Sequence, residues 1–274
     1  MDRWPGGRPA DTEGIDLRRP NSARMYDYYL GGSTNFEADR EAADRALAAN
    51  PDVVPSIRAN RGFLGRVVRY LVDQGIDQFL DLGSGIPTAG NVHDIAHRLD
   101  PAVRVVYVDN EPVTVAHARQ LITDVKQVEI VDADLRDPET VFERAEETRL
   151  LDFSRPLGLL MVSVLNFIED DAEVAELVRR YVAQLAPGSY LAVSHSTAQW
   201  LAPETAARIA ELYRDVNPPS YWRSPEQIGR LFAGMELVPP GVVAPSHWRP
   251  EAEPQLPPER IVYRAGLARI GDPA

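Results

Sequence analysis

The sequence predicts an α/β fold: a doubly wound, mostly parallel sheet with an antiparallel terminal strand and a helical N-terminal extension. Between residues 78 and 195, five short apolar segments alternate with helix-length amphipathic segments, as parallel strands joined by helical crossovers do. Two later apolar segments, near 236–238 and 261–268, are separated by a proline-rich stretch instead of a helix, so we expect them to pair antiparallel. The residues before 76 show helical patterns only.

The N-terminal part should contain an arm and two helices. Residues 1–20 are rich in Pro, Gly, Asp and Arg, which predicts a flexible arm. Thr34 and Glu37 have the spacing of a capping box, so we expect a helix from there to about Ala49. A second helix over 56–73 carries one apolar stripe.

The chain divides into two regions. We expect residues 1–75 to form a helical extension or lid and 76–274 to form one continuous sheet domain. On the helix after the first strand, Val92, Ile95 and Leu99 lie at helical spacing and predict the apolar face. The expected strands are 78–82, 104–108, 127–131, 157–165 and 190–195. Further helices are expected at 138–148, 170–185 and 203–216, and two more should begin at 112 and at 224.

Composition excludes several functions. The chain has 29 Lys and Arg against 41 Asp and Glu, a net charge of −12, which argues against a nucleic-acid partner. The longest apolar stretch, 157–165, is far shorter than the roughly 20 residues that cross a membrane. There is no cysteine, and only His93 and His97 are spaced like helical metal ligands; both should face away from the core, so no metal is expected. We expect a soluble, cytoplasmic protein.

A glycine turn follows the first strand, where open parallel sheets bind their ligands. Gly83 and Gly85 let the backbone approach a ligand, and Asp109 ends the second strand, where a carboxylate can accept ribose hydroxyls. A dinucleotide fingerprint would have a third glycine where this chain has Thr88. Asp81 would repel a pyrophosphate but favour a bound cation. The pattern therefore favours a cationic nucleoside over an anionic one.

These motifs resemble those of class I S-adenosylmethionine-dependent methyltransferases, which have a Rossmann-like sheet. The resemblance rests on the turn Asp81–Pro87, the acid at Asp109 and the segment Asp132–Asp137. The N-terminal run Arg19–Gly32 (RPNSARMYDYYLGG) is more specific and is similar to that of a bacterial family of S-adenosyl methyltransferases. The resemblance implies S-adenosyl-L-methionine as the cofactor.

Carried over residue by residue, the resemblance implies a cofactor site made of four segments, each following a strand. They are the methionine and ribose turn (Asp81, Gly83, Ser84, Gly85), the ribose acceptor Asp109 with Asn110, the adenine neighbours Asp134 and Leu135, and Val164, which presents backbone near the adenosine or methyl group.

Other candidates each have a functional and a structural interpretation. Tyr26, Tyr28 and Tyr29 can form a lid whose rings make cation–π contact with the sulfonium, or they can pack on the core. Arg61 can pair with the cofactor carboxylate or be a solvated helix residue. His195, which ends the fifth strand, can be a base or a hydrogen-bonded structural histidine. Tyr29 and His195 are the candidate catalytic residues.

The acceptor pocket has weaker signals. Trp200, Tyr221, Trp222 and Trp248 lie in segments expected to surround it, and together they suit an apolar or aromatic acceptor. We therefore expect a methyltransferase acting on a small molecule. One alternative is a cofactor-binding regulatory or scaffold module without transferase activity. A weaker alternative is an NAD-dependent oxidoreductase, which Thr88 and the lack of a Tyr-x-x-x-Lys pair disfavour.

Overall fold

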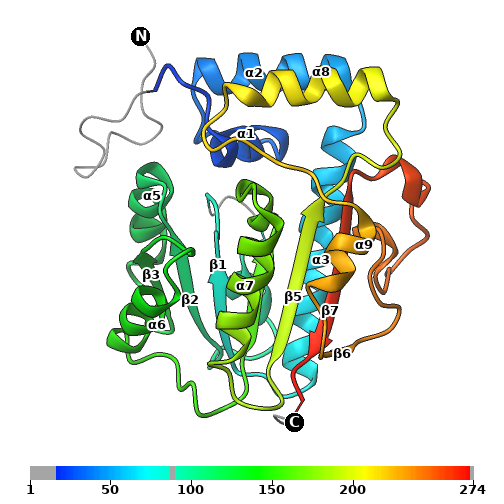
Figure 1. Ribbon diagram of the computed structural model, residues 1–274. Coiled ribbons are helices and arrows are strands. Elements are labelled where there is room, and N and C mark those ends of the chain that lie inside the picture. Colours follow the sequence, from blue (N-terminus) through cyan, green and yellow to red (C-terminus); the bar gives the residue numbers. More distant parts are fainter. Residues whose placement is uncertain (1–16, 87–89, 272–274) are drawn as a thin grey trace.

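A computed structural model describes residues 17–86 and 90–271. Its seven-stranded sheet has the order β3-β2-β1-β4-β5-β7-β6, with β1 to β5 parallel and β7 antiparallel to both of its neighbours (Figure 1). The predicted mixed sheet is thus confirmed. The strands are β1 (Gln78–Leu82), β2 (Arg104–Asp109), β3 (Val128–Asp132), β4 (Gly158–Val162), β5 (Tyr190–Ser196), β6 (Glu236–Leu237) and β7 (Tyr263–Arg269).

Helices cover both faces of the sheet (Figure 1). One face packs against α3 (Val53–Asp73), α4 (Val92–Ala96) and α5 (Pro112–Ile122). The other packs against α6 (Pro138–Glu147) and α7 (Asp171–Val182). The remaining elements are α1 (Ser22–Tyr29), α2 (Glu37–Ala49), α8 (Pro203–Arg214), α9 (Pro225–Arg230) and the short 3-10 helices η2 (Leu165–Phe167), η3 (Pro245–His247) and η4 (Pro258–Arg260).

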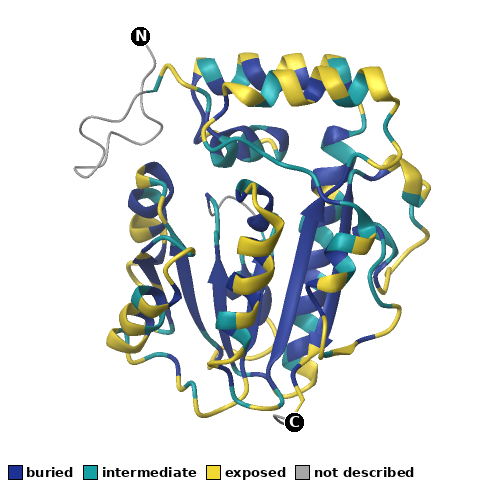
Figure 2. Ribbon diagram, viewed as in Figure 1, coloured by how far each residue is buried: buried dark blue, intermediate teal, exposed yellow. Residues whose placement is uncertain are grey.

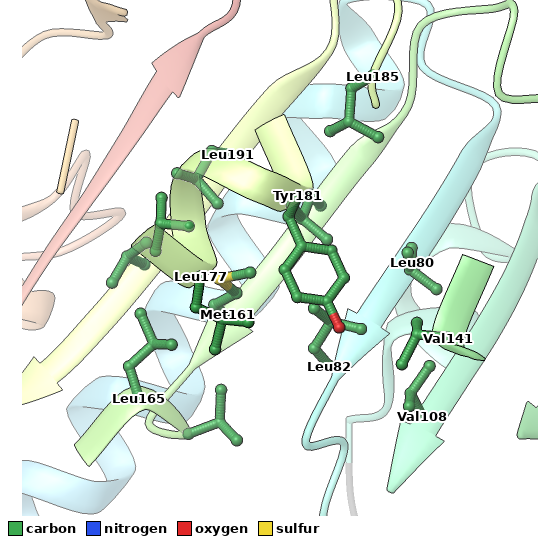
Figure 3. Packing of buried hydrophobic residues seen from close by; sticks show 14 of the residues in the cluster. Leu80, Leu82, Val108, Val141, Met161, Leu165, Leu177, Tyr181, Leu185 and Leu191 are labelled. Carbon is green, nitrogen blue, oxygen red and sulfur yellow. The ribbon is translucent and has the colours of Figure 1, made fainter. Parts of the chain in front are cut away.

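The central strands β1, β4 and β5 are buried almost throughout, because helices cover both of their faces. Figure 2 shows them as the most buried part of the molecule. In the close view of Figure 3, Val141 of α6 and Tyr181 of α7 lie against Leu80 and Leu82 of β1, and all four side chains are buried. This rigid sheet fixes the positions of the turns at its carboxyl ends. Within the described residues, no helix is both long and apolar enough for a membrane span.

A roof of three helices, α1, α2 and α8, lies over the carboxyl ends of the parallel strands (Figure 1). Met25 and Tyr29 of α1 are buried in a cluster of their own with Ala43, Ile57 and Tyr263. The roof therefore joins the N-terminal helices to α8, which follows β5. The packing also divides residues 17–75, because α1, α2 and the first turns of α3 belong to this roof cluster whereas α3 from Phe63 on packs on the sheet.

Helix α2 begins later than its sequence signal indicated. The carboxylate that caps it is Asp39, whose Oδ2 accepts from the Phe36 amide at 2.8 Å. The Thr34 amide instead donates to Asp27 of α1 at 2.9 Å. The capping box predicted at Thr34 and Glu37 is therefore wrong: the cap lies two residues later, at Phe36 and Asp39, because the Thr34 amide is already bound by Asp27.

Helix α4 is shorter than expected. It ends after Ala96, so Leu99 leaves the apolar face and is 48% exposed. His93, expected to face away from the core, is buried, because the Tyr107 hydroxyl of β2 lies 2.7 Å from its Nδ1. The expectations for residues 1–16 and for Thr88 concern positions outside the described residues.

Candidate active site

A cavity of about 730 Å³ lies between the roof and the carboxyl ends of the parallel strands. Its floor is formed by the turns after β1, β2, β3 and β4, and α1 forms much of its ceiling. This is the place where an open parallel sheet binds its ligand. The volume lies within the range of roughly 300–1,000 Å³ typical of small-molecule sites.

The glycine turn after β1 needs glycine for two reasons. Gly83 has a φ of 68°, a left-handed conformation that side chains disfavour. A Cβ at Gly83 would also lie 2.1 Å from Cγ2 of Val164, so the turn packs directly against the segment after β4. Gly85, with φ 66°, donates its amide to Oδ2 of Asp109 at 2.9 Å and has open space beside it.

Two carboxylates lie beside this turn. The Asp81 side chain lines the cavity and is 5% exposed. Burial raises the pKa of its carboxyl to about 7. The positive charge of Arg61 acts to lower this pKa, and the negative charge of Asp109 acts to raise it. Burial also raises the pKa of Asp109, against the hydrogen bonds from the Glu111 and Gly85 amides that lower it. Each oxygen keeps a lone pair for a ligand hydroxyl or amine.

The turn after β3 supplies the outer wall of the cavity, with Asp134, Leu135 and Arg136. The Asp134 carboxylate accepts from the Arg136 guanidinium at 2.6 Å. Partial burial acts to raise the pKa of Asp134, but the hydrogen bonds and charge of Arg136 hold it below its usual value. Asp134 is therefore ionised and keeps acceptor capacity toward the cavity.

Uncharged polar groups line the cavity beyond β4. Strand β4 ends at Val162, earlier than the predicted 165, because Ser163 adopts a φ of 59° and turns the chain into η2. The Ser163 hydroxyl donates to Tyr263 of β7 at 3.2 Å, and Asn166 donates its amide to Ser220 at 3.4 Å.

Tyrosines from the roof complete this wall. The Tyr29 and Tyr213 hydroxyls lie 3.2 Å apart, joining α1 to α8. The Tyr26 hydroxyl accepts from Asn60 of α3 at 3.3 Å. Tyr26, Tyr29, Tyr213 and Tyr263 all line the cavity, and burial raises the pKa of each. They are neutral at physiological pH.

The structure brings most of the predicted site residues together. Ten of the cofactor-binding candidates line this one cavity: Asp81, Gly83, Ser84, Gly85, Asp109, Asn110, Asp134, Leu135, Val164 and Arg61. Arg61 also donates to Asn91 at 3.1 Å, which holds its guanidinium at the edge of the site. Of the candidate catalytic residues, Tyr29 lines the cavity as well.

Two candidates do not line the cavity. Tyr28 points to the outer side of α1, where its hydroxyl donates to Asp44 of α2 at 3.0 Å. His195 is fully buried behind the site: Nδ1 lies 2.8 Å from the Ser196 carbonyl, and Nε2 lies 2.8 Å from the Arg223 guanidinium. Burial lowers the pKa of His195 to about 4, so it is a neutral structural histidine.

The four aromatic residues expected around the acceptor are not among the lining residues. Trp248 is completely buried on the α3 side, with its ring edge-on to Phe63 at 5.4 Å between centroids. Trp200 stacks under the Arg264 guanidinium, 3.8 Å from the ring centroid. Tyr221 contributes its backbone amide, which donates to the Asn166 carbonyl at 2.8 Å, and Trp222 also lies outside the lining.

Sequence reasoning missed a buried ion-pair network under the roof. Arg24 of α1, 2% exposed, donates to Asp39 of α2 at 2.8 Å and to Glu111 at 3.4 Å. Glu111 follows the ribose candidate Asp109 and caps α5 through the Thr114 amide. Arg24 stands within the N-terminal motif, but its partners are distant in sequence and give no local signal.

Comparison with known proteins adds the family. The model of the family described as S-adenosyl methyltransferase matches residues 9–271. A candidate methyltransferase from Thermobifida fusca YX is 39% identical, with a TM-score of 0.87, and the match covers 94% of this chain and 98% of that one. A DUF574 family protein from Streptomyces avermitilis MA-4680 is 36% identical, with a TM-score of 0.87 and coverage of 93% and 99%.

More distant structures share the fold alone. The N-methyltransferase NodS from Bradyrhizobium japonicum WM9, solved with S-adenosyl-l-homocysteine, is 15% identical, with a TM-score of 0.51 and coverage of 90% and 98%. No protein of curated function is detectably similar. The family match confirms S-adenosylmethionine as the cofactor and methyl transfer as the activity, in place of the oxidoreductase and non-catalytic alternatives. The chain belongs to the S-adenosyl methyltransferase family.

Proposed function

We propose that this methyltransferase binds S-adenosylmethionine across the turns after β1, β2 and β3 and methylates a small molecule held under the roof. The adenosine lies between Asp109 and Asp134, and the methionine part lies at Gly83–Gly85. The proposal depends on the roofed cavity, because residues from all of these segments line it.

The residues present suit this cofactor. Because Gly83 has no side chain, its backbone packs directly against Val164, and the turn leaves space above it for a ligand. Asp109 has lone pairs for two ribose hydroxyls, and Asp81 offers a buried acceptor to an amino group. Arg61 lies near Asp81 and provides a cation for the methionine carboxylate.

When bound, S-adenosylmethionine supplies a methyl group already activated by a sulfonium. The chain then has two tasks, which are to align the acceptor with that methyl group and to exclude water. Tyr26 and Tyr29 of α1 form the ceiling, and the segment from Ser163 to Asn166 forms the wall that faces them. Since the tyrosine hydroxyls stay protonated, they hold the acceptor by hydrogen bonds and do not act as bases.

An enclosed site favours a compact acceptor over a polymer. The ceiling is built from α1, whose Ser22 amide donates to the carbonyl of Asn217, just after α8, at 3.1 Å. The net charge of −12 also opposes binding of a polyanion. We therefore infer a small-molecule acceptor and no nucleic-acid substrate.

Isothermal titration tests the cofactor position. We expect S-adenosylmethionine and S-adenosylhomocysteine to bind and NAD not to bind. Asp109→Ala should weaken cofactor binding by about 1.5–3 kcal/mol, the scale of hydrogen bonds to a charged group. Asp124→Ala, which removes an exposed carboxylate at the end of α5, is the matched control and should bind normally.

Two outcomes would contradict the proposal. The first is tight NAD binding with no response to either methyl-donor compound. The second is methylation of bulk RNA or DNA at physiological salt, which a roofed cavity does not permit.

A further inference from the structure

The cavity is divided into a charged and an uncharged part. Among the described residues, the charged lining residues that the sheet and its turns contribute lie at or after the carboxyl ends of β1, β2 and β3: Asp81, Asp109, Glu111, Asp134 and Arg136. Those that follow β4 or belong to β7 are uncharged, and include Ser163, Asn166 and Tyr263. The cofactor proposed above occupies the first part, so the second part is left for the acceptor.

The other charged lining residues that the structure describes lie before α1, on α1 or on α3, and each has a polar partner. Arg61 of α3 donates to Asn91 at 3.1 Å. Arg24 pairs with Asp39 and Glu111. Asp27 accepts from the Thr34 amide at 2.9 Å. Arg19 is exposed and donates to the Asp215 carbonyl at 3.4 Å.

We define the tyrosine cluster as Tyr26, Tyr29, Tyr213 and Tyr263. Its members come from three elements that are far apart in sequence, α1, α8 and β7, and all four line the cavity. Their hydroxyls are held by neighbours: Tyr29 by Tyr213 at 3.2 Å, and Tyr263 by Ser163 at 3.2 Å. The cluster is therefore a preorganised aromatic wall with neutral hydrogen-bonding edges.

An anionic acceptor would be unfavourable in the uncharged part, because its charge would lose water without gaining a counterion, and a protonated amine has no lone pair to receive the methyl group. Among the described residues, the same part offers no base. Burial raises the pKa of all four tyrosines, and His195 lies outside the cavity. Asp81 belongs to β1, three strands away from Tyr263 in the sheet order. A suitable nucleophile must carry a free lone pair without losing a proton.

We propose that the tyrosine cluster is the acceptor subsite and that it takes an uncharged nitrogen heteroaromatic, methylated on a ring nitrogen. This assignment rests on the proposed function. The nitrogen lone pair forms the new N–C bond as the methyl carbon's bond to sulfur breaks with its electron pair going to sulfur. The positive charge passes from the sulfonium to the acceptor ring, and no proton moves. Tyrosine faces stabilise such a cation by cation–π contact without a carboxylate.

Four bicyclic probes of similar size test the class: quinoline, 1-naphthol, 1-naphthoate and 1-naphthylmethylamine. Their binding is measured on protein saturated with S-adenosylhomocysteine, and transfer is measured with labelled S-adenosylmethionine. We expect quinoline to bind at least about tenfold more tightly than 1-naphthoate, and to be the one probe that takes up label, as N-methylquinolinium. Equal binding of 1-naphthoate, or methylation of 1-naphthol or 1-naphthylmethylamine, would overturn the class.

Variants of the cluster test the subsite. Tyr213→Leu and Tyr263→Leu should each weaken binding of N-methylquinolinium by about tenfold, whereas the corresponding Phe variants, which keep the ring, should lose much less. Tyr28→Leu is the matched control, since Tyr28 lies outside the cavity on the same helix as Tyr26, and it should change nothing. Unchanged affinity for S-adenosylhomocysteine shows that each variant is folded.

The cofactor site and the acceptor subsite can be tested separately. If S-adenosylhomocysteine binds but none of the four probes does, the aromatic acceptor subsite is wrong and the cofactor proposal stands. If S-adenosylhomocysteine itself does not bind, the proposed function fails and the acceptor assignment fails with it.

Discussion

Gly83 and Gly85 have almost the same backbone conformation, with φ values of 68° and 66°, but different surroundings. A Cβ on Gly83 would overlap Val164, whereas a Cβ on Gly85 would meet nothing within 4 Å. Gly85→Ala should therefore cost only the left-handed strain, about 1–2 kcal/mol. Gly83→Ala should cost more and also abolish cofactor binding, because Val164 must move.

Denaturant unfolding and S-adenosylhomocysteine titration of the two alanine variants check this difference. If Gly83→Ala is as stable as Gly85→Ala and binds equally well, the contact with Val164 does not shape the site.

The buried carboxyl of Asp81 lowers the stability of the folded protein near neutral pH, although it offers an acceptor to the cofactor. Its carboxyl has a pKa of about 7 in the folded protein against 3.8 as the ordinary value, because burial disfavours the charged form. The native state thus holds a proton that the unfolded chain releases, so the associated stability is present below pH 3.8 and is lost as the pH rises through 7. The loss is at most about 4 kcal/mol.

Asp81→Asn should remove this pH dependence. We expect the variant, without cofactor, to be more stable than the wild type at pH 8 and similar to it at pH 4, while it binds S-adenosylmethionine more weakly. Thermal unfolding across this pH range is the measurement. A wild-type stability that rises between pH 4 and pH 8 as steeply as that of the variant would refute the raised pKa.

At the scale of elements, a buried arginine ties the roof to the sheet domain by charge. Arg24 carries the charge that compensates Asp39, which is 0% exposed, and reaches Glu111 at the N-terminus of α5. Arg24→Ala leaves the Asp39 carboxylate buried and unpaired, so we expect a loss of about 3–5 kcal/mol in the free energy of unfolding. Arg179→Ala breaks an exposed pair with Glu176 and should have little effect.

Denaturant titration of both arginine variants measures this. A loss as small for Arg24→Ala as for Arg179→Ala would mean that α1 and α2 are held by apolar packing alone.

The elements that the sequence predicted well are those whose signal is local. The strands β1, β2 and β3 and the turns after them follow from apolar runs that end in Gly or Asp, and their bounds differ from prediction by at most one residue. The end of β4 was misplaced because Ser163, with no glycine at that position, adopts a left-handed conformation. The Ser163 hydroxyl also contacts Tyr263, 100 positions away in the sequence, and no local pattern encodes that contact.

At the scale of the whole molecule, the site was predictable on its sheet side and only in part on its roof side, where Tyr29 was a candidate and Tyr213 was not. Asp81, Asp109 and Asp134 could be placed together because parallel strands bring their carboxyl ends to one edge. Tyr29 and Tyr213 are 184 residues apart in sequence, and only the folded roof makes them neighbours. The misassigned Trp248 shows the same limit, since its segment returns to the far side of the sheet against Phe63.

The roof and the sheet have separate cores, and this separation can be tested by deletion. The two apolar clusters of the sheet contain no residue before Phe63, whereas α1 belongs to the third cluster. Deleting residues 1–32 should therefore leave the sheet folded, with its far-UV circular dichroism and cooperative unfolding retained. The deletion removes Tyr26, Tyr29 and Arg24, so turnover should be abolished and affinity for S-adenosylhomocysteine should fall.

Circular dichroism and titration of the same truncated protein separate the two effects. Full activity after truncation would show that the ceiling is not part of the site. Loss of the cooperative sheet transition would show instead that α1 is needed for folding. A folded sheet with reduced affinity is the outcome expected when the roof, which lies over the strand ends, completes a binding site that the sheet alone leaves open to water.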